Sequence, residues 1–513
     1  MDEKIKTLLK SVKPQYRCIA ISVFVSGMLA HGMGLFNKYS MHDDIEHLFG
    51  SYGIGYSNGR WMWAVLTEIV KSIWGNNVSL PLWGGIISFI FIILSACLLV
   101  QMLEVKSSLL AGILGCFMVV RPIVAGVFGY MFVLPYYMFA EFLGFLGAYI
   151  IYRYRKPCLY IMGILMMACA TGIYQAFIPS ILCVMLFRFV LTIHEDRLGE
   201  KTYIREGFHY IVSILAFVAL YAILTKVIMW WKQTSLISYK GLDHMWDMSH
   251  IGERTLRAYY KFFVPEPKLS QMIYPGQCIY IYYLAVLFCG CIALFAAIEA
   301  YKKNKWNGIL VILSILVFPL CACFIYVMCE SEYVAGLMLY GQIMPFIYMI
   351  CLIQQLEYKK QIQKVFIAIA IAAVMFVNLN YIRLDNASYV KAEFMQQRAI
   401  SWHTTLITRI KSIEGYRGDL PITYINKFEA YDASVSDMIG WDFVKMPPYE
   451  NINLSLNNFI WSKYINYWCG FGQAEVASQG YEELQEVKQM PFYPDDGSIK
   501  IIDGVIVVKF GRE

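Results

Sequence analysis

The sequence predicts a polytopic α-helical membrane protein with about eleven transmembrane helices and a small α/β domain at its C-terminal end. Hydrophobic residues make up 58% of the 513 residues and charged residues only 16%, and the mean hydropathy is +0.52. These values are too apolar for a soluble globular protein. Long apolar runs recur up to residue 381, and the composition then becomes polar. We therefore expect a membrane domain at 1–381 and a separate domain at 382–513.

A helix crosses the hydrocarbon core of a bilayer with about 20 mainly apolar residues. By that measure the expected spans lie at 18–36, 79–102, 108–122, 131–152, 158–174, 178–193, 208–230, 278–300, 307–328, 333–354 and 365–381. Gly172 and Pro179 flank a break between the fifth and sixth spans, which fits a tight turn or a kink.

Lysine and arginine are concentrated in alternate connections, for example at 4–17, 153–156 and 302–305. Cytoplasmic connections carry such an excess, so the N-terminus is expected in the cytoplasm. An odd number of spans then places the domain at 382–513 on the outer, extracytoplasmic face.

Two connections on the expected outer face are long, at 37–78 and 231–277. Binding and catalytic residues concentrate in long loops that a rigid scaffold holds, so the outer face is the expected working face. Within the first loop, residues 61–74 mix tryptophans with charged side chains, which predicts an amphipathic helix in the headgroup region.

The C-terminal region predicts a helix near 387–413 and strands near 421–425 and 505–510. Asp503-Gly504 is a turn signal directly before the last strand. Cys469 is the only cysteine in this region, so a disulfide within it is excluded.

An acidic turn, His42-Asp43-Asp44-Ile45-Glu46, directly follows the first span. Neighbouring carboxylates repel one another, and such repulsion can raise one pKa and create a general base. We take Asp43 and Asp44 as candidate catalytic residues and His42 and Glu46 as candidate substrate-binding residues. A solvated loop that caps a helix, or a metal site of His and Asp, are the alternatives.

Two arginines lie at the expected outer membrane edge, against the usual charge bias. Arg60 follows Asn58, and both are candidate substrate-binding residues, because a guanidinium suits a lipid phosphate. Arg121 precedes Pro122 at the end of a span and is a third candidate. Interfacial snorkelling for Arg60, and an ion pair with Glu141 for Arg121, are the structural alternatives.

A Thr-Gly-Ile-Tyr-Gln-Ala-Phe stretch at 171–177 supplies Tyr174 and Gln175 at the same membrane edge. A phenol and an amide can both hydrogen-bond sugar hydroxyls, so both are candidate substrate-binding residues. Satisfaction of a broken helix is the alternative. Glu330 and Glu332 flank another outer turn, without an assigned role.

In their order, the acidic pair at 43–44, the Asn-Gly-Arg-Trp run at 58–61 and the Gly-Ile-Tyr-Gln-Ala-Phe run at 172–177 resemble the Gtr-type glucosyltransferases that decorate bacterial O-antigens. The resemblance covers residues 15 to about 380. It implies the GT-C architecture, a bacterial plasma membrane, and inverting transfer from a polyprenyl-phosphate sugar to a surface glycan. It further implies Asp43 or Asp44 as the base and Arg60 and Arg121 on the phosphate, without a metal or other cofactor.

Two other classes use the same membrane and the same lipid carriers. A flippase or transporter would favour internal symmetry and broken helices at the midplane, which the sequence does not show. A polysaccharide polymerase would carry an arginine-rich outer loop, whereas 231–277 holds only Arg254 and Arg257. Nucleic acid is not an expected partner, and the lipid bilayer is.

Overall fold

A computed structural model describes residues 12–39, 42–47, 55–75, 79–194, 200–237, 250–264, 278–329, 334, 336–356, 359–426 and 454–511. Among these residues, nine helices are long and apolar enough to cross a membrane. Two shorter apolar helices, Pro157–Ile173 and Tyr340–Ile353, coincide with two more of the expected spans. The polytopic helical fold is therefore confirmed.

The described part of the chain starts with the long helix α2 (Pro14–Phe36), followed by the short α3 (His42–Glu46) and by α4 (Trp61–Trp74), where the sequence predicts an amphipathic helix. The helices that follow are α5 (Pro81–Met102), α6 (Ser108–Val120), α7 (Pro122–Phe128), α8 (Leu134–Arg153), α9 (Pro157–Ile173), η1 (Gln175–Phe177), α10 (Ile178–His194), α11 (Glu200–Lys232), α12 (Ile251–Phe263), α14 (Cys278–Lys303), α15 (Lys305–Ala322), α16 (Ile325–Met328), η4 (Gly336–Met338), η5 (Tyr340–Ile343), α17 (Met344–Ile353) and α18 (Gln361–Lys411).

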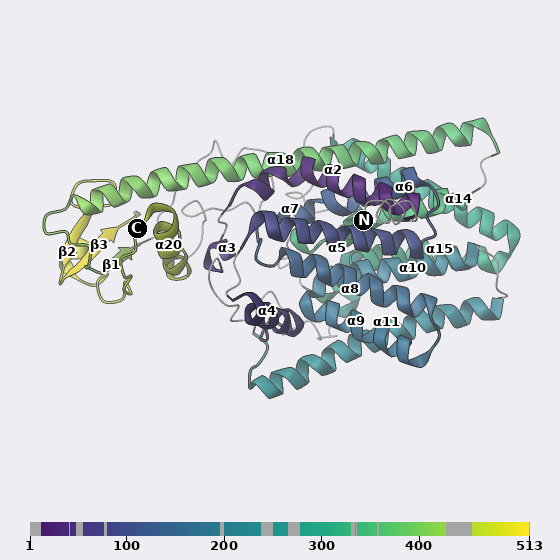
Figure 1. Cartoon of the computed structure of the whole chain (residues 1–513), viewed down its shortest axis with the longest axis horizontal. Helices are drawn as coiled ribbons and strands as arrows, with labels where there is room; N and C mark the ends of the chain where they lie inside the picture. The colour runs from purple at the N-terminus through teal and green to yellow at the C-terminus, as the bar shows by residue number, and fades with distance from the viewer. Residues whose placement is uncertain are drawn as a thin grey trace, which may run out of the picture.

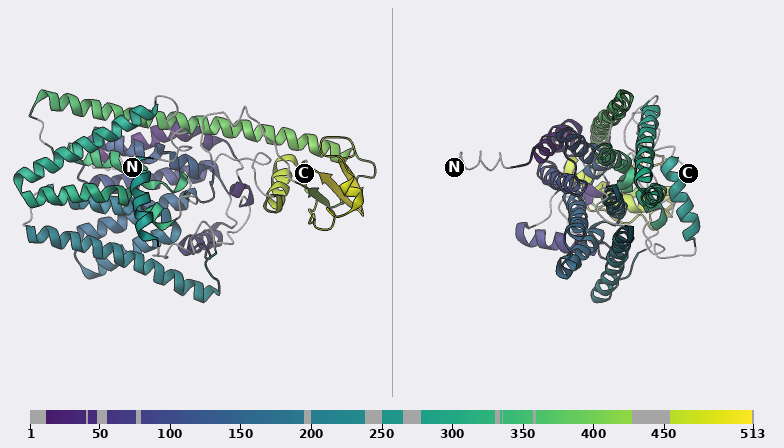
Figure 2. Two further views of the ribbon diagram at one scale, coloured as in Figure 1. Left: turned by 180° about the vertical axis from the view of Figure 1, so that it is seen from behind. Right: turned by 90° about the vertical axis from the view of Figure 1, so that its right-hand side faces the viewer.

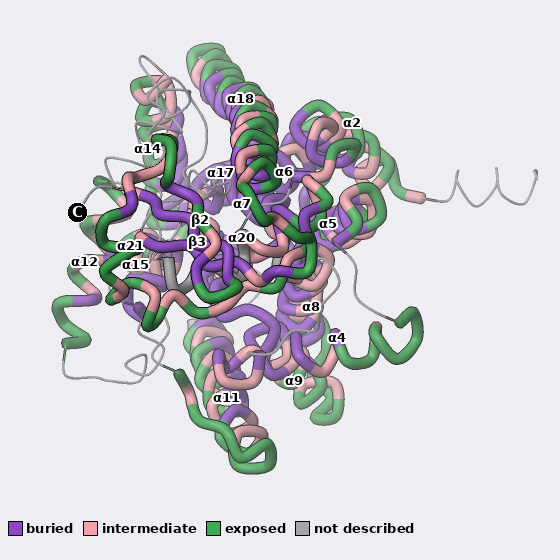
Figure 3. Tube along the Cα trace, turned by 90° about the vertical axis from the view of Figure 1, so that its left-hand side faces the viewer, coloured by how far each residue is buried: buried purple, intermediate pink, exposed green. Residues whose placement is uncertain are grey.

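The helices at the periphery of the bundle carry apolar side chains on their outward faces. Only 22% of the span in α11 is buried, and Ile211, Leu215 and Trp231 are all more than half exposed. Figure 3 shows this helix at the periphery, largely exposed. A monomeric soluble protein rarely exposes so large an apolar surface, so these faces are suited to lipid.

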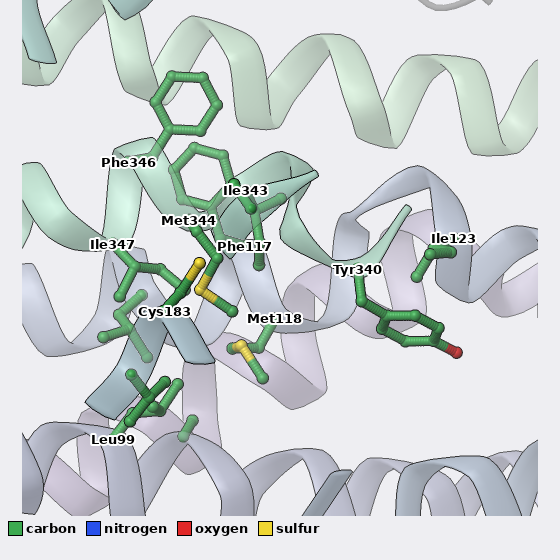
Figure 4. Close-up of a cluster of buried hydrophobic side chains, with 14 of the residues drawn as sticks. Leu99, Phe117, Met118, Ile123, Cys183, Tyr340, Ile343, Met344, Phe346 and Ile347 are labelled. Carbon is green, nitrogen blue, oxygen red and sulfur yellow. The ribbon is translucent and has the colours of Figure 1, made fainter. Parts of the chain in front are cut away.

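The centre of the bundle is the α6–α7 span, which is 94% buried. Phe117 of α6 stacks on Phe346 of α17 with ring centroids 5.0 Å apart. Tyr340 lies at the edge of the same apolar cluster, and its hydroxyl points away from the neighbouring side chains that Figure 4 draws. The centre of the Tyr340 ring also lies 5.2 Å from the guanidinium of Arg121, the residue that precedes α7.

Helix α18 is a single helix of 51 residues, where the sequence predicts a span at 365–381 and a separate helix near 387–413. At 1.5 Å per residue it is about 76 Å long. A bilayer core uses about 30 Å of this length, so the rest extends beyond the bundle, as Figure 1 shows. The expected domain boundary at residues 381 and 382 falls inside this helix.

The region at the far end of α18 forms a small sheet with β1 (Ile422–Ile425), β2 (Ile499–Ile502) and β3 (Val505–Lys509), in the order β1-β3-β2. Strand β1 is parallel to β3, and β2 is antiparallel to it. Asp503 and Gly504 both have positive φ, so the predicted turn at these residues is a hairpin turn between β2 and β3. Helices α20 (Leu454–Cys469) and α21 (Gln485–Lys488) accompany the sheet.

Helices α3 and α4 and this C-terminal sheet all lie at one end of the helical bundle (Figures 1 and 2). The basic connection between α14 and α15 lies at the opposite end. The structure therefore matches the expected arrangement in which the first long loop and the C-terminal domain share a face.

Thiol labelling tests which face this is. Cys469 is partly exposed at the end of α20, and Cys158 is exposed in the first turn of α9. Helix α9 meets α4 at Gly172, near its other end, so the two thiols belong to opposite ends of the bundle. We expect a membrane-impermeant maleimide to modify Cys469 in intact protoplasts and Cys158 only after permeabilisation.

Burial raises the pKa of the Cys469 thiol, so the labelling requires mildly alkaline buffer. Cys469→Ser and Cys158→Ser identify the two modified positions. Labelling of Cys158 in intact cells, with Cys469 protected until permeabilisation, would show that the orientation is opposite to the expected one.

Candidate functional site

The acidic turn forms α3, and its two aspartates differ in environment. Asp44 is fully buried. Its Oδ1 accepts a hydrogen bond from Ser79 Oγ at 2.6 Å and a longer one from the backbone N–H of Phe132 at 3.4 Å. Its Oδ2 is ion-paired with Lys38, whose ammonium also donates to Ser79 Oγ at 2.8 Å. Asp44 therefore anchors the loop to neighbouring segments, and the alternative of a solvated loop is wrong for this residue.

Asp43 is only half-buried. Successive residues of an α-helix point about 100° apart, so Asp43 does not share the enclosure that holds Asp44. The structure separates the two members of the predicted pair into one enclosed carboxylate and one that solvent reaches. The side chains of His42 and Glu46, and residues Glu330 and Glu332, lie outside the described residues.

Two side chains from elsewhere in the bundle hold the Asn-Gly-Arg turn before α4 through its backbone carbonyls. Gln175 Nε2 donates to the carbonyl of Asn58 and to the Tyr221 hydroxyl, each at 3.0 Å. The Tyr221 hydroxyl donates to the carbonyl of Gly59 at 3.1 Å. Gly59 has φ of 67°, and a Cβ there would lie 2.8 Å from that hydroxyl. The amide donor of Gln175 is thus engaged in fixing the turn that carries Arg60.

Arg60 lies against two stacked tyrosines. Its Nη1 donates to the Tyr137 hydroxyl at 3.2 Å, and its guanidinium is 5.0 Å from the ring centre of Tyr174. The two rings stack with centroids 4.2 Å apart. A guanidinium held over an aromatic face is fixed in direction while keeping its charge.

Arg121 is 2% exposed and lies deeper in the bundle. Its Nη2 pairs with Glu141 Oε2 at 2.5 Å, so the expected structural alternative is what the structure shows. The guanidinium also lies 5.2 Å from the ring centre of Tyr340. Arg121 Nε and Nη1, Glu141 Oε1 and the Tyr340 hydroxyl are buried without a hydrogen-bond partner in the described part of the chain.

Helix α8 sets the spacing of the two arginines. Tyr137 and Glu141 are four residues apart, so they lie on one face of the helix about one turn from each other. Tyr137 contacts Arg60 and Glu141 contacts Arg121. Tyr174 and Tyr340, with centroids 6.2 Å apart, connect the two contacts from the other side.

Phe132, between α7 and α8, joins the acidic turn to α4. Besides donating its backbone N–H to Asp44, its ring lies 4.6 Å from the ring of His47 and 6.4 Å from that of Trp63. The segment 121–141 therefore contacts the acidic turn and both arginines. This one segment therefore contacts sequence-predicted residues from three separate loops.

Several residues of the site were missed in the sequence: Lys38, Ser79, Phe132, Tyr137, Tyr221 and Tyr340. Lys38 carries a signal that could have found it, since it is a cation on the expected outer face, six residues before Asp44. Tyr137 carries a weaker one, its spacing of four from Glu141. The others have no local signal, because only the tertiary packing brings them to the site.

The Arg121–Glu141 pair yields a stability prediction. Arg121→Met leaves a buried carboxylate uncompensated, which typically costs about 3–5 kcal/mol. Replacing both partners by apolar residues of similar size is often nearly neutral. We expect Arg121→Met to lower the amount and thermal stability of the purified protein, and Arg121→Met combined with Glu141→Leu to recover most of both. Equal losses in the single and the double variant would contradict this interpretation.

Comparison with known proteins identifies the family of the chain. The glucosyl transferase GtrII family model matches residues 32–346, more than half of the chain. The matched region contains every described residue of the site named above, and it ends before α18. No curated protein and no solved structure gives a significant match. The resemblance predicted from the acidic pair, the Asn-Gly-Arg-Trp run and the mid-chain tyrosine motif is confirmed: the chain belongs to the GtrII family of glucosyl transferases.

Proposed function

We propose that this membrane protein transfers a sugar, with inversion, from a polyprenyl-phosphate donor to a cell-surface glycan at the outer face of the bacterial plasma membrane. Glucose is the sugar that the family description favours. One observation carries the proposal: segment 121–141 brings an acidic turn and an arginine together at one end of a membrane bundle. A carboxylate base and a cation for phosphate are the two groups that such a transfer needs.

In the proposed mechanism Asp43 is the general base. Its carboxylate takes the proton from an acceptor hydroxyl as the oxygen attacks the anomeric carbon of the donor. The new glycosidic bond forms while the bond from that carbon to the phosphate oxygen breaks on the opposite face, so the configuration inverts. Polyprenyl phosphate leaves with the electron pair. Asp44 does not suit this role, because Lys38, Ser79 and the Phe132 amide already occupy its oxygens.

Arg60 is the proposed contact for the donor phosphate. It is less buried than Arg121, and the Tyr137 hydroxyl and the Tyr174 ring set the direction of its guanidinium. A cation that stabilises the leaving phosphate makes a general acid unnecessary. Arg121, neutralised by Glu141, keeps Tyr340 and α8 in place behind Arg60. Gln175 and Asn58 fix the turn before Arg60, and Tyr174 lies next to the proposed phosphate position.

The donor class is tested with purified protein in detergent or nanodiscs. We expect transfer of labelled glucose from polyprenyl-phosphate glucose to the isolated surface glycan of the source cell, and none from nucleotide-activated glucose alone. Turnover of the nucleotide sugar in a preparation free of lipid carrier would exclude the proposed donor.

The two aspartates are distinguished by different measurements. Asp43→Asn keeps the shape but removes the base, so we expect transfer to fall by about 10²–10⁴-fold while donor binding and thermal stability are retained. Asp44→Asn leaves the Lys38 ammonium without its counter-charge, so we expect a lower thermal midpoint as well as lower activity. A transfer rate of Asp43→Asn equal to that of the wild-type protein would show that another residue is the base.

Arg60→Lys preserves the charge but loses the planar fork and its stacking on Tyr174. We expect the KM for the lipid donor to rise by roughly tenfold, with the protein amount in membranes unchanged. The matched control is Arg257→Lys, because Arg257 pairs with Glu253 on α12 and belongs to no part of the site described above. An unchanged KM in Arg60→Lys, equal to that of the control, would count against the phosphate contact.

A further inference from the structure

The second half of α18 lies against the end of α2 and the start of the first loop. Tyr389 packs on Gly34 so closely that a Cβ at this glycine would lie 2.7 Å from the tyrosine ring. The Tyr389 hydroxyl is 2.9 Å from Nδ1 of the buried His31, and its ring stacks on that of Tyr39 with centroids 6.1 Å apart. The chain that leads from α2 to the acidic turn is therefore fixed to α18 at its first residues.

Two turns further along α18, Gln396 contacts the residue that pairs with Asp44. Gln396 is 6% exposed, and its Nε2 donates to the backbone carbonyl of Lys38 at 3.0 Å. The ammonium of Lys38 then reaches Asp44 and Ser79. The backbone position of Lys38, and with it the Lys38–Asp44 pair, depends on an amide supplied by α18.

Helix α20 completes the contact. Ile45 of α3, Ala399 of α18 and Tyr464 of α20 form a fully buried apolar cluster. The Tyr464 hydroxyl also lies 3.5 Å from the carbonyl of Gln396. Helix α3 has only five residues, and a helix this short has no stability of its own. Its orientation, and the direction in which Asp43 points, therefore depend on packing on these two helices together with the contacts of Asp44 and His47.

We propose that the extramembrane part of α18 and helix α20 position the acidic turn for catalysis, with Gln396 and Tyr464 as positioning residues. Both lie outside the family-matched region 32–346, so this chain completes a family active site with its own C-terminal region. The inference rests on the proposed function, in which Asp43 of that turn is the base.

The test uses the full-length protein and measures kcat and donor KM separately. Gln396→Met keeps the volume and removes the donor, and Gln397→Met changes the exposed neighbour on the same helix. Tyr464→Ala opens the apolar cluster, and Tyr467→Ala is its exposed counterpart on α20. Protein amount and resistance of the C-terminal domain to trypsin are measured for all four variants.

Loss of one hydrogen bond typically changes a rate by roughly three- to tenfold. We expect Gln396→Met to lower kcat by that factor and Tyr464→Ala by at least as much, with donor KM within about twofold of the wild type and both controls unchanged. Combining Gln396→Met with Ser79→Ala should be less than multiplicative, because both act on Asp44.

Wild-type kcat in both Gln396→Met and Tyr464→Ala would overturn the inference, as would a loss that appears only in protein amount or only in donor KM. Failure of the wild-type protein to use any lipid-linked donor would refute the proposed function instead. The two failures are thus distinguishable in the same set of measurements.

Discussion

The buried ion pair between Arg121 and Glu141 closes the segment on which the site is built. Arg121 ends α6 and precedes Pro122 of α7, and Glu141 lies in the second turn of α8, so the pair ties the two ends of 121–141 together. Phe132 and Tyr137 lie between these ends, and they contact the acidic turn and Arg60. In a low-dielectric interior, separating the two charges is costly, so this segment has little freedom to move.

Two buried carboxylates at this end of the bundle, Asp44 and Glu141, are paired with cations of the protein itself. Lys38 takes Asp44, and Arg121 takes Glu141. Each pair fixes backbone that would otherwise be a loop at the membrane edge. This pairing explains how a cluster that looks repulsive in the sequence is stable, because Lys38 from the same loop compensates the charge of Asp44.

The sequence predicts the helical membrane fold well, because hydropathy over 20 residues reports directly on the solvent around a helix. The amphipathic α4 and the last strand also lie where their patterns predict them. The sequence pattern predicts two helices in place of α18, because Asn378, Asn380 and Arg383 end the apolar run. A better signal was present: residues 361–411 contain neither proline nor glycine, so nothing interrupts the helix.

The site could be predicted only in part, since its residues were identified one loop at a time. Asp44 and Gln175 are at the site, but their polar atoms serve the scaffold, a role that becomes visible only when Lys38 and Tyr221 are placed beside them. The contribution of Gln396 has no signal in the sequence, because it lies more than 350 residues from Lys38 along the chain.

Because α18 is uninterrupted, it also fixes the direction in which its side chains point around the helix axis. Each residue in a helix adds 1.5 Å of height and 100° of rotation, so one residue inserted before Tyr389 would turn Tyr389, Gln396 and Ala399 away from the first loop together. Insertions of about 7 or 11 residues would nearly restore the direction but raise the contacts by about 10 or 16 Å. The number of residues in α18 therefore sets two things at once: the distance of the C-terminal domain from the membrane, and the direction in which its contact residues face.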